Sequence, residues 1–537
     1  MSPPTVDLTR DPTSGPDRPG GLVLPSQDDP VVAGTTEALG GPPGRHALLG
    51  ERRFWTPLRW LVLLTLVTSL FGWWQKSPCR VHAWVDEYQY TRGCYTDVFA
   101  LYFAERLNEG KTPYAEHPVE YPVVIGGVMQ LAAKTVEVIE PDLNERPRRF
   151  YDVTWLILTA CALVVVVTTA RLAGRRRPWD AAMFAVAPLL VLHGTTNWDL
   201  VAMALAGLGL VQWSRRNPLA AGVLLGLATA TKLYPVLFLV PLFALCLRAR
   251  QLKTFAVTAV AMVLTPVLVS LPVYLTSPSF ADVGGTQTQV AASPLDRLGD
   301  EGLVRALSPK VELIGPDGVA TTGVNAAYRF FQLNTTRPAD WDSGWRVLEK
   351  VIGHPLDQNL APGEAPHVLN RGVALSFLFC LALIVLLAVK APRRPRLMQL
   401  LFLTIVAFLM TNKVWSPQFS IWLVPLALLA RPRWRPLLAW QAAEAMVLLT
   451  RFYFFVRNSD TNRQKGIDDW WFITALGLRN AVLLVLVAFV VRDVLAPEKD
   501  VVRADGVDDP AGGVLDEAPD RDASWVGRRL GRPLVKT

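Results

Sequence analysis

The chain has 537 residues, of which 51% are hydrophobic and only 19% are charged, and its formal net charge is +8. A soluble chain of this length would usually carry more charge and divide into several domains. The positive charge does not indicate a nucleic-acid-binding protein, because the basic residues are concentrated in short loops between apolar blocks. The chain also contains no zinc-type cysteine spacing, Walker loop or nucleic-acid motif.

Two polar tails flank a hydrophobic centre. Residues 1–50 are rich in Pro, Gly, Asp and Thr, and residues 492–537 carry many Asp, Arg and Gly, so both are predicted to be disordered. The apolar blocks of residues 51–491 predict an all-α polytopic membrane protein with about 12 transmembrane helices. The predicted spans are 57–75, 152–171, 180–194, 198–213, 218–233, 235–248, 254–276, 371–390, 397–413, 418–430, 436–455 and 471–491.

The basic clusters indicate the orientation of these spans. If the spans cross the membrane alternately, seven clusters fall on one side, and the side rich in Lys and Arg is normally the cytoplasm. This arrangement places both termini in the cytoplasm and predicts a multi-pass protein of the plasma membrane. The clusters are Arg52/Arg53/Arg59, Arg175–Arg177, Arg215/Arg216, Arg248/Arg250/Lys253, Lys390/Arg393/Arg394/Arg396, Arg431/Arg433/Arg435 and Arg492.

Two predicted outer loops are long, 76–151 and 277–370. Long loops in compact proteins are usually functional or disordered. Residues 119–138 of the first loop are apolar, but the segment is short and carries Lys134 and Glu137. We predict that it lies in the membrane interface and does not cross the bilayer.

The cysteines agree with this topology. Cys79 and Cys94 both fall in the first outer loop, whereas Cys161, Cys246 and Cys380 lie within predicted spans. An oxidising outer compartment would allow a disulfide between Cys79 and Cys94. The spacing alone leaves two unpaired thiols as the alternative.

Asp97, in CYTDVFALYFAERL, is the first candidate for chemistry. It begins an amphipathic stretch, where Thr96 or Asp97 can simply cap a helix. The functional alternative is a general base, because an acceptor hydroxyl needs a positioned carboxylate to take its proton. Asp86 and Glu87 form a second acidic pair and a further candidate for chemistry. The alternative is that they simply belong to a solvated loop surface.

Further polar residues fall at the outer boundary of the spans. Asn197 and Asp199 lie in HGTTNWDLVAM, Lys232 in TKLYP, and Lys413 and Gln418 in TNKVWSPQF. A lysine at such a boundary can snorkel to the surface or bind a phosphate as a point charge. Carboxylates and cations at a lipid–water boundary suit a lipid-linked phosphate donor and a hydroxylated acceptor, with no metal required.

The order of these motifs resembles a known family. YTD, LYFAERLNEGKTPY and VEYP are followed by NWDL, TKLYP and NKVWSPQF. This series resembles the polyprenol-phosphate-mannose-dependent mannosyltransferases of glycosyltransferase family 87. NKVWSPQF is also similar to the asparagine–lysine–valine motif of the mannosyltransferase that builds glycosylphosphatidylinositol anchors.

The resemblance implies a GT-C glycosyltransferase fold with a catalytic Asp in the first outer loop, here Asp97. It further implies transfer of mannose, with inversion, from a polyprenyl-phosphate sugar to a glycolipid or glycan, with no cofactor. Lys232, Lys413, Asn197, Asp199, Gln418, Glu120 and Tyr121 are the expected substrate-binding residues. A membrane transporter or lipid-linked-sugar flippase is the alternative from another class, and transfer of another sugar, such as arabinofuranose, is the alternative within the enzyme class.

Overall fold

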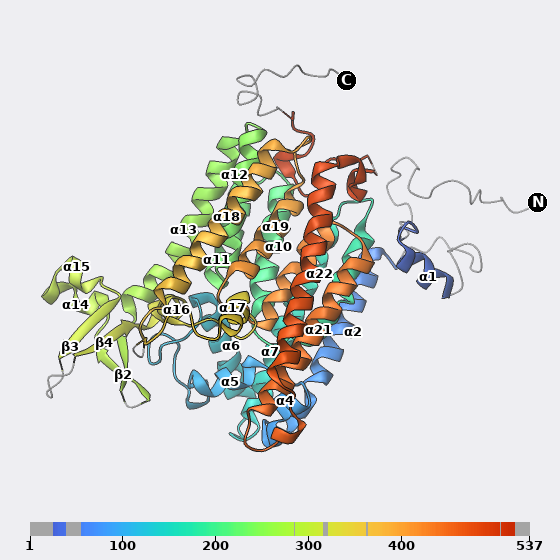
Figure 1. Ribbon diagram of the computed structural model, residues 1–537. Coiled ribbons are helices and arrows are strands. Elements are labelled where there is room, and N and C mark those ends of the chain that lie inside the picture. The colour runs from blue at the N-terminus through green and yellow to red at the C-terminus, as the bar shows by residue number, and fades with distance from the viewer. Residues whose placement is uncertain are drawn as a thin grey trace, which may run out of the picture.

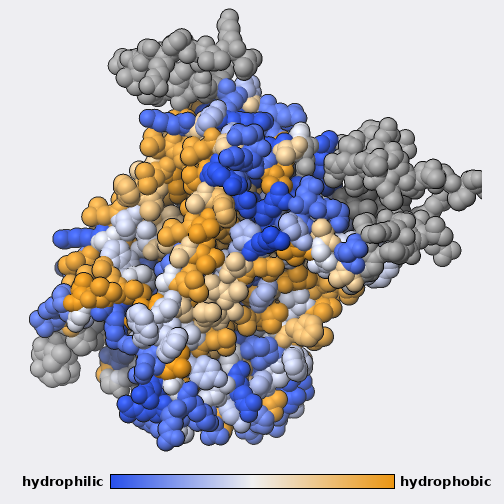
Figure 2. All heavy atoms as spheres, turned by 45° about the vertical axis from the view of Figure 1, so that its right-hand side comes forward, coloured by the Kyte–Doolittle hydropathy of each residue, from blue (hydrophilic) through white to orange (hydrophobic). Residues whose placement is uncertain are grey.

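The structure is a computed structural model that describes residues 25–38, 55–283, 285–314, 320–360, 363–504 and 506–520. Long helices lie side by side in a bundle (Figure 1). Short helices gather at its lower end, which we call the loop end, and a small sheet projects from its flank. Figure 2 shows hydrophilic residues gathered at the loop end and hydrophobic residues over much of the flank above it.

The first helices lead into the loop end and out of it again. Thr56 caps the first long helix by accepting a hydrogen bond from the Arg59 amide, and Pro57 occupies the first helical position. The elements are α1 (Pro30–Ala38), α2 (Pro57–Gln75), α3 (Ser77–His82), η1 (Val85–Glu87), α4 (Tyr88–Thr91), α5 (Asp97–Ala104), η2 (Leu107–Glu109), α6 (Val123–Ile139) and α7 (Arg146–Leu172).

A series of shorter helices follows in the middle of the chain. The elements are η3 (Pro178–Ala181), α8 (Ala182–Ala185), α9 (Pro188–His193), α10 (Asp199–Ser214), α11 (Pro218–Thr231), η4 (Tyr234–Phe238), α12 (Leu239–Arg248) and α13 (Leu252–Thr276). The predicted span 180–194 is wrong as a continuous helix. Helix α8 ends before Val186, and α9 starts anew at Pro188, which lacks the amide hydrogen that a continuing helix needs.

The second long loop contains a four-stranded antiparallel sheet in the order β2-β1-β4-β3. Ser279, at the start of β1, pairs with Asn325, at the end of β4, so the chain enters and leaves the sheet close to the end of α13. The elements are β1 (Ser279–Val283), β2 (Thr286–Ala291), α14 (Pro294–Glu301), α15 (Leu303–Ala306), β3 (Lys310–Ile314), β4 (Ala320–Asn325), η5 (Ala326–Tyr328), α16 (Arg329–Thr336) and α17 (Gly344–Ile352).

The last third of the chain completes the bundle. The elements are α18 (His367–Lys390), α19 (Leu397–Thr411), η6 (Pro417–Trp422), α20 (Leu423–Ala430), α21 (Trp434–Arg457), η7 (Arg463–Lys465), α22 (Asp469–Leu495), η8 (Pro497–Lys499), α23 (Val501–Ala504) and η9 (Gly513–Leu515).

Among the residues that the structure describes, five helices, α2, α7, α13, α18 and α22, are long and apolar enough to cross a membrane. Shorter apolar helices, including α10, α11 and α19, pack among them. A predominantly helical chain with several such helices is a membrane protein, as the composition predicts. Residues 119–138 correspond to α6, a separate helix of 17 residues at the loop end.

Both predicted tails are partly folded, which corrects the sequence analysis. Asp500 pairs with Arg396 at 2.7 Å, and the Trp213 indole donates to the Gly512 carbonyl at 2.8 Å. The disorder expected from residue 492 is therefore wrong for residues 492–504 and 506–520, because their carboxylates neutralise arginines of the bundle. At the other terminus, the Trp434 amide donates to Asp29 beside α1. The rest of the two predicted tails lies outside the described residues.

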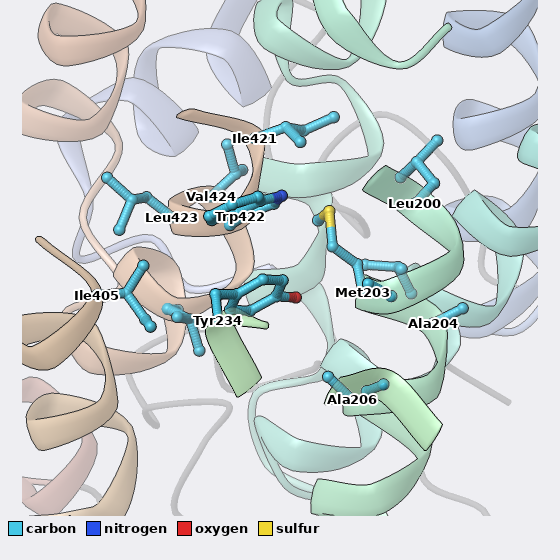
Figure 3. Packing of buried hydrophobic residues seen from close by; sticks show 14 of the residues in the cluster. Leu200, Met203, Ala204, Ala206, Tyr234, Ile405, Ile421, Trp422, Leu423 and Val424 are labelled. Carbon is cyan, nitrogen blue, oxygen red and sulfur yellow. The ribbon is translucent and has the colours of Figure 1, made fainter. Parts of the chain in front are cut away.

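Large apolar side chains fill the bundle next to the polar residues of α10. Figure 3 shows Met203 of α10 and Ile405 of α19 close to the rings of Tyr234 and Trp422. These two rings stack with their centroids 4.3 Å apart. The stacked rings join η4 to η6, and the Trp422 indole also donates to the buried carboxylate of Asp199 in α10.

Candidate active site at the loop end

Asp97 lies in the first turn of α5, and its neighbour provides the cap. The Thr96 hydroxyl accepts from the Val98 amide at 3.2 Å and lies 2.7 Å from the Thr195 carbonyl. The Asp97 amide donates to the Thr196 carbonyl at 2.8 Å. The backbone is thus satisfied without the Asp97 carboxylate, which is free for other contacts. Of the two capping alternatives, the structure selects Thr96.

The Asp97 carboxylate accepts three hydrogen bonds from three separate segments. The Tyr95 hydroxyl donates to Oδ1 at 2.7 Å, and the Asn197 amide donates to Oδ2 at 2.7 Å. The Gln418 amide donates to Oδ2 at 3.1 Å, across a separation of 321 residues. These donors hold the carboxylate in one orientation, which a general base requires. The structure therefore joins Asp97, Asn197 and Gln418, three of the predicted site residues.

Asn197 links Asp97 to a second layer of residues. Its Nδ2 also donates to the Tyr121 hydroxyl at 2.7 Å. Its Oδ1 accepts from the Lys232 ammonium at 3.3 Å and from the Trp198 amide at 2.7 Å. The side-chain amide of Asn197 is therefore fixed at both ends, which fixes its orientation toward Asp97.

Lys232 is paired inside the protein. Its ammonium lies 3.4 Å from Asp199 Oδ1, and the exposed fractions of the two residues are 6% and 1%. The rings of Tyr121 and Phe419 also enclose the ammonium, at 4.9 and 5.5 Å from its nitrogen. Asp199 accepts a further hydrogen bond from Trp422 at 2.8 Å. Lys232 and Asp199 thus form a buried ion pair directly behind Asn197.

A cavity of about 140 Å³ opens beside Asp97. Aromatic rings form much of its wall, and two cations lie next to it. The Lys76 ammonium donates to the Tyr95 carbonyl at 2.8 Å, and Arg451 donates to Asp342 at 2.9 Å. The lining residues are Lys76, Tyr90, Tyr95, Asp97, His193, Thr196, Ser416, Pro417, Gln418, Leu448, Arg451, Phe452 and Phe455.

His193 is buried at the edge of this cavity. Within the described residues, neither of its ring nitrogens has a hydrogen-bond partner. Both His193 and Lys76 were missed as site residues by the sequence analysis. His193 stands only four residues before Asn197, and Lys76 directly follows the end of α2, so their positions beside the predicted site were a usable signal.

Glu120 lies farther out in the first loop, where it contacts the second loop. Its carboxylate pairs with Arg337 at 2.7 Å. Burial raises the pKa of Glu120, although the positive charge of Arg337 acts in the opposite direction. The Glu120 amide donates to the Glu105 carboxylate. Burial raises the pKa of Glu105 to about 8. Burial also lowers the pKa of His117, whose Nε2 lies 3.7 Å from Glu105 Oε2.

Lys413 lies in the turn between α19 and η6, as its motif predicts, and contacts the second long loop. Its ammonium donates to the Asn370 side chain at 2.6 Å and to the Thr335 carbonyl at 3.1 Å. It is not among the residues that line the cavity beside Asp97. Lys413 thus fastens the second long loop to the bundle, and the structure does not bring it together with Gln418 and Asp97.

A disulfide joins Cys79 of α3 to Cys94, three residues before Asp97. This bond ties the chain leading into Asp97 to α3, the helix that follows α2. Among the residues that the structure describes, no group of three or more His, Cys, Asp or Glu side chains could hold a metal ion.

Part of the chain matches a known protein family. Residues 148–293 match the family model of glycosyltransferase family 87. This range includes Asn197, Asp199 and Lys232 and ends well before Gln418. No curated protein matches the chain. Over residues 148–293 the chain is therefore similar to glycosyltransferase family 87, and this match, together with the apolar helices, indicates a glycosyltransferase embedded in a membrane.

Proposed function

We propose that the protein transfers a mannosyl group from a polyprenyl-phosphate sugar to a hydroxyl group of a glycolipid or glycan, with inversion at the anomeric carbon. The observation that carries this proposal is the Asp97 carboxylate, held by Tyr95, Asn197 and Gln418 at the edge of a cavity. A fixed carboxylate next to an open space suits a base that takes a proton from a bound hydroxyl.

In the proposed reaction Asp97 accepts the proton of the acceptor hydroxyl. The acceptor oxygen forms a bond to the sugar C1, and the bond from C1 to the phosphate oxygen breaks. The electron pair of that bond leaves with the polyprenyl phosphate. Cations that face the developing negative charge lower the barrier of such a step.

Within this proposal, Lys76 and Arg451 are the cations nearest to the leaving phosphate. Both line the cavity that Asp97 lines. This assignment replaces the earlier expectation for Lys232 and Lys413, because neither of them lines the cavity beside Asp97: Lys232 pairs with Asp199, and Lys413 donates to Asn370. Within this proposal Lys232 positions Asn197, and Asn197 in turn orients Asp97.

The aromatic wall supports a sugar as the group that the cavity receives. Tyr90 and Tyr95 stack with centroids 6.5 Å apart, and Phe452 lies 6.2 Å from Tyr95. Such rings can pack against the apolar faces of a sugar while polar groups bind its hydroxyls. We place the reaction on the outer face of the plasma membrane with both termini in the cytoplasm, because the basic clusters assign the opposite end to the cytoplasm.

The test uses membranes that contain the protein, polyprenyl-phosphate mannose and a panel of glycolipid acceptors. The wild type should form a mannosylated product without any ion gradient, which a transporter would not do. Asp97→Asn should lower the rate by about 10²–10⁴-fold, the usual contribution of a general base. Asp86→Asn is the matched control, because Asp86 is an exposed carboxylate of the same loop, and this variant should keep full activity.

The outcomes separate the parts of the proposal. Full activity in a well-expressed Asp97→Asn variant would show that Asp97 is not the base. Product formation only with another polyprenyl-phosphate sugar, such as arabinofuranose, would keep the mechanism and change the sugar. Absence of transfer from every lipid-linked sugar by the wild type would refute the proposed activity.

A further inference from the structure

The two short helices of the second loop, α14 and α15, together with Leu307 directly after α15, expose five large apolar side chains. Val304 is 87% exposed, and Leu303 is 62% exposed. The set, which we call the leucine patch, consists of Leu295, Leu298, Leu303, Val304 and Leu307. Single exposed apolar residues are normal, but a contiguous patch marks a surface that something covers.

The same helices bury an arginine. Arg297 is 7% exposed, and its guanidinium donates to the carbonyls of Ala292 and Ala306 and to Glu301. The charged group thus holds the turn between α14 and α15 together, while the leucines point outward. This arrangement is the reverse of the one expected for helices surrounded by water.

The charged residues of α14 lie on another side of the helix. Leu295 and Leu298 are three residues apart and share one face, whereas Asp296 and Asp300 are four residues apart and share a second face. All four side chains are exposed. Helix α14 is therefore amphipathic on its outer surface, with one apolar side and one acidic side.

The patch lies beside a membrane-spanning helix. The hydroxyl of Tyr274, in the last turn of α13, donates to the Leu307 carbonyl at 2.8 Å. Helix α13 has 25 residues, which corresponds to about 37 Å and exceeds the ~30 Å of a hydrocarbon core, so its last turn lies near the headgroups. Tyr274 therefore holds the patch at the level of the membrane surface.

Helix α13 itself has an exposed apolar surface. Only 17% of the apolar window of α13 is buried, and Leu264, Val267 and Leu268 are each at least half exposed, as expected for side chains that face lipid. Figure 1 shows α14 and α15 above the strands of the sheet, and β2 below them toward the loop end. The patch therefore extends the lipid-facing surface at the loop end.

We propose that the leucine patch binds the lipid bilayer, with its apolar side chains inserted at the boundary between headgroups and acyl chains of the leaflet at the loop end. Amphipathic helices typically bury their apolar faces about 5–10 Å deep at this boundary. The acidic side of α14 then faces the water. This contact anchors the small sheet to the membrane and does not depend on the reaction that the protein catalyses.

Fluorescence quenching in nanodiscs tests the proposal. The free cysteines Cys161, Cys246 and Cys380 are first replaced by alanine, and Val304→Cys is labelled with bimane. The high exposure of Val304 means that its replacement leaves no cavity in the core. Leu295→Cys serves as a second reporter, and Thr286→Cys, exposed at the start of β2, is the matched control. Gel filtration verifies that each variant is folded and monodisperse.

Lipids that carry a nitroxide near the top of the acyl chain should quench bimane at residues 304 and 295 several-fold more than aqueous iodide does. Iodide should dominate at residue 286. Equal access of iodide to residues 304 and 286 would overturn the proposal. Shielding of residue 304 from both quenchers, with cross-linking to a second copy or another protein, would also overturn it, because a protein would then cover the patch.

Discussion

Replacing Lys232 by methionine distinguishes a buried ion pair from a phosphate ligand. The ammonium lies 3.4 Å from Asp199 Oδ1, and both side chains are almost fully buried. Removing one partner of a buried pair leaves the other charge uncompensated, which typically costs about 3–5 kcal/mol of stability. We therefore expect Lys232→Met to lower the thermal midpoint of the detergent-solubilised protein markedly.

A second substitution should restore much of this loss. Asp199→Asn removes the remaining charge but keeps an oxygen that can accept the hydrogen bond from Trp422. The double variant should therefore unfold closer to the wild type, since replacing both members of a buried pair is often nearly neutral. Lys134→Met is the control: Lys134 forms an exposed pair with Glu137, and such pairs contribute about 0–1 kcal/mol.

The assay is a thermal melt of the purified variants, combined with the transfer assay. An unchanged midpoint for Lys232→Met, together with a raised KM for the lipid-linked sugar, would refute the ion-pair reasoning. It would restore Lys232 as the phosphate ligand. Failure of the double variant to recover would show that the loss has another cause than the uncompensated charge of Asp199.

Three further predictions concern stability. Burial raises the pKa of Glu105 from 4.5 to about 8, so the stability of the wild type should fall as the pH rises through this interval. Glu105→Gln should flatten this pH dependence in thermal melts recorded between about pH 5 and 9. An unchanged slope of stability against pH would contradict the assignment to Glu105. Replacing both Cys79 and Cys94 by serine opens a loop of 15 residues and should cost about 3 kcal/mol, seen as a lower midpoint that reducing agent no longer changes. Asp500→Ala leaves the buried Arg396 unpaired and should cost about 3–5 kcal/mol, whereas an unaltered midpoint would show that this terminal contact is dispensable.

The local features of the fold were predictable from the sequence because they depend on local signals. The apolar block at 57–75 became α2 with the same bounds, since Thr56 and Pro57 mark its start. Pro188 also marks a helix boundary in the sequence, and the prediction of one continuous span over 180–194 did not take it into account. A proline preceded by a short apolar run is a helix boundary whether or not the segment is hydrophobic.

The contacts around Asp97 were only partly predictable. The order of motifs brought Asp97, Asn197 and Gln418 to one end of the bundle, but no local signal states that Asn197 and Gln418 donate to the same carboxylate. The partners of Lys232 and Lys413 depend on tertiary packing. Two lysines that follow similar boundary patterns therefore have different roles, one paired with Asp199 and one fastened to Asn370.

The folded terminal segment was missed for a related reason. An acidic, glycine-containing stretch has the composition of a disordered tail. Its carboxylates become structural only because arginines far away in the sequence lie opposite them, as Arg396 lies opposite Asp500 and Arg248 opposite Asp520. The composition of the terminal segment shows its carboxylates but does not show which distant arginines pair with them.

This segment also has a consequence for the order of events during synthesis. Residues 500–520 contact α10 through Trp213, α12 through Arg248 and the loop before α19 through Arg396. The ribosome makes these residues after all the helices that they join. A nascent chain that stops after α22 therefore exposes several unneutralised arginines in a nearly complete bundle. The pairing of those charges is therefore one of the last steps by which the bundle is completed.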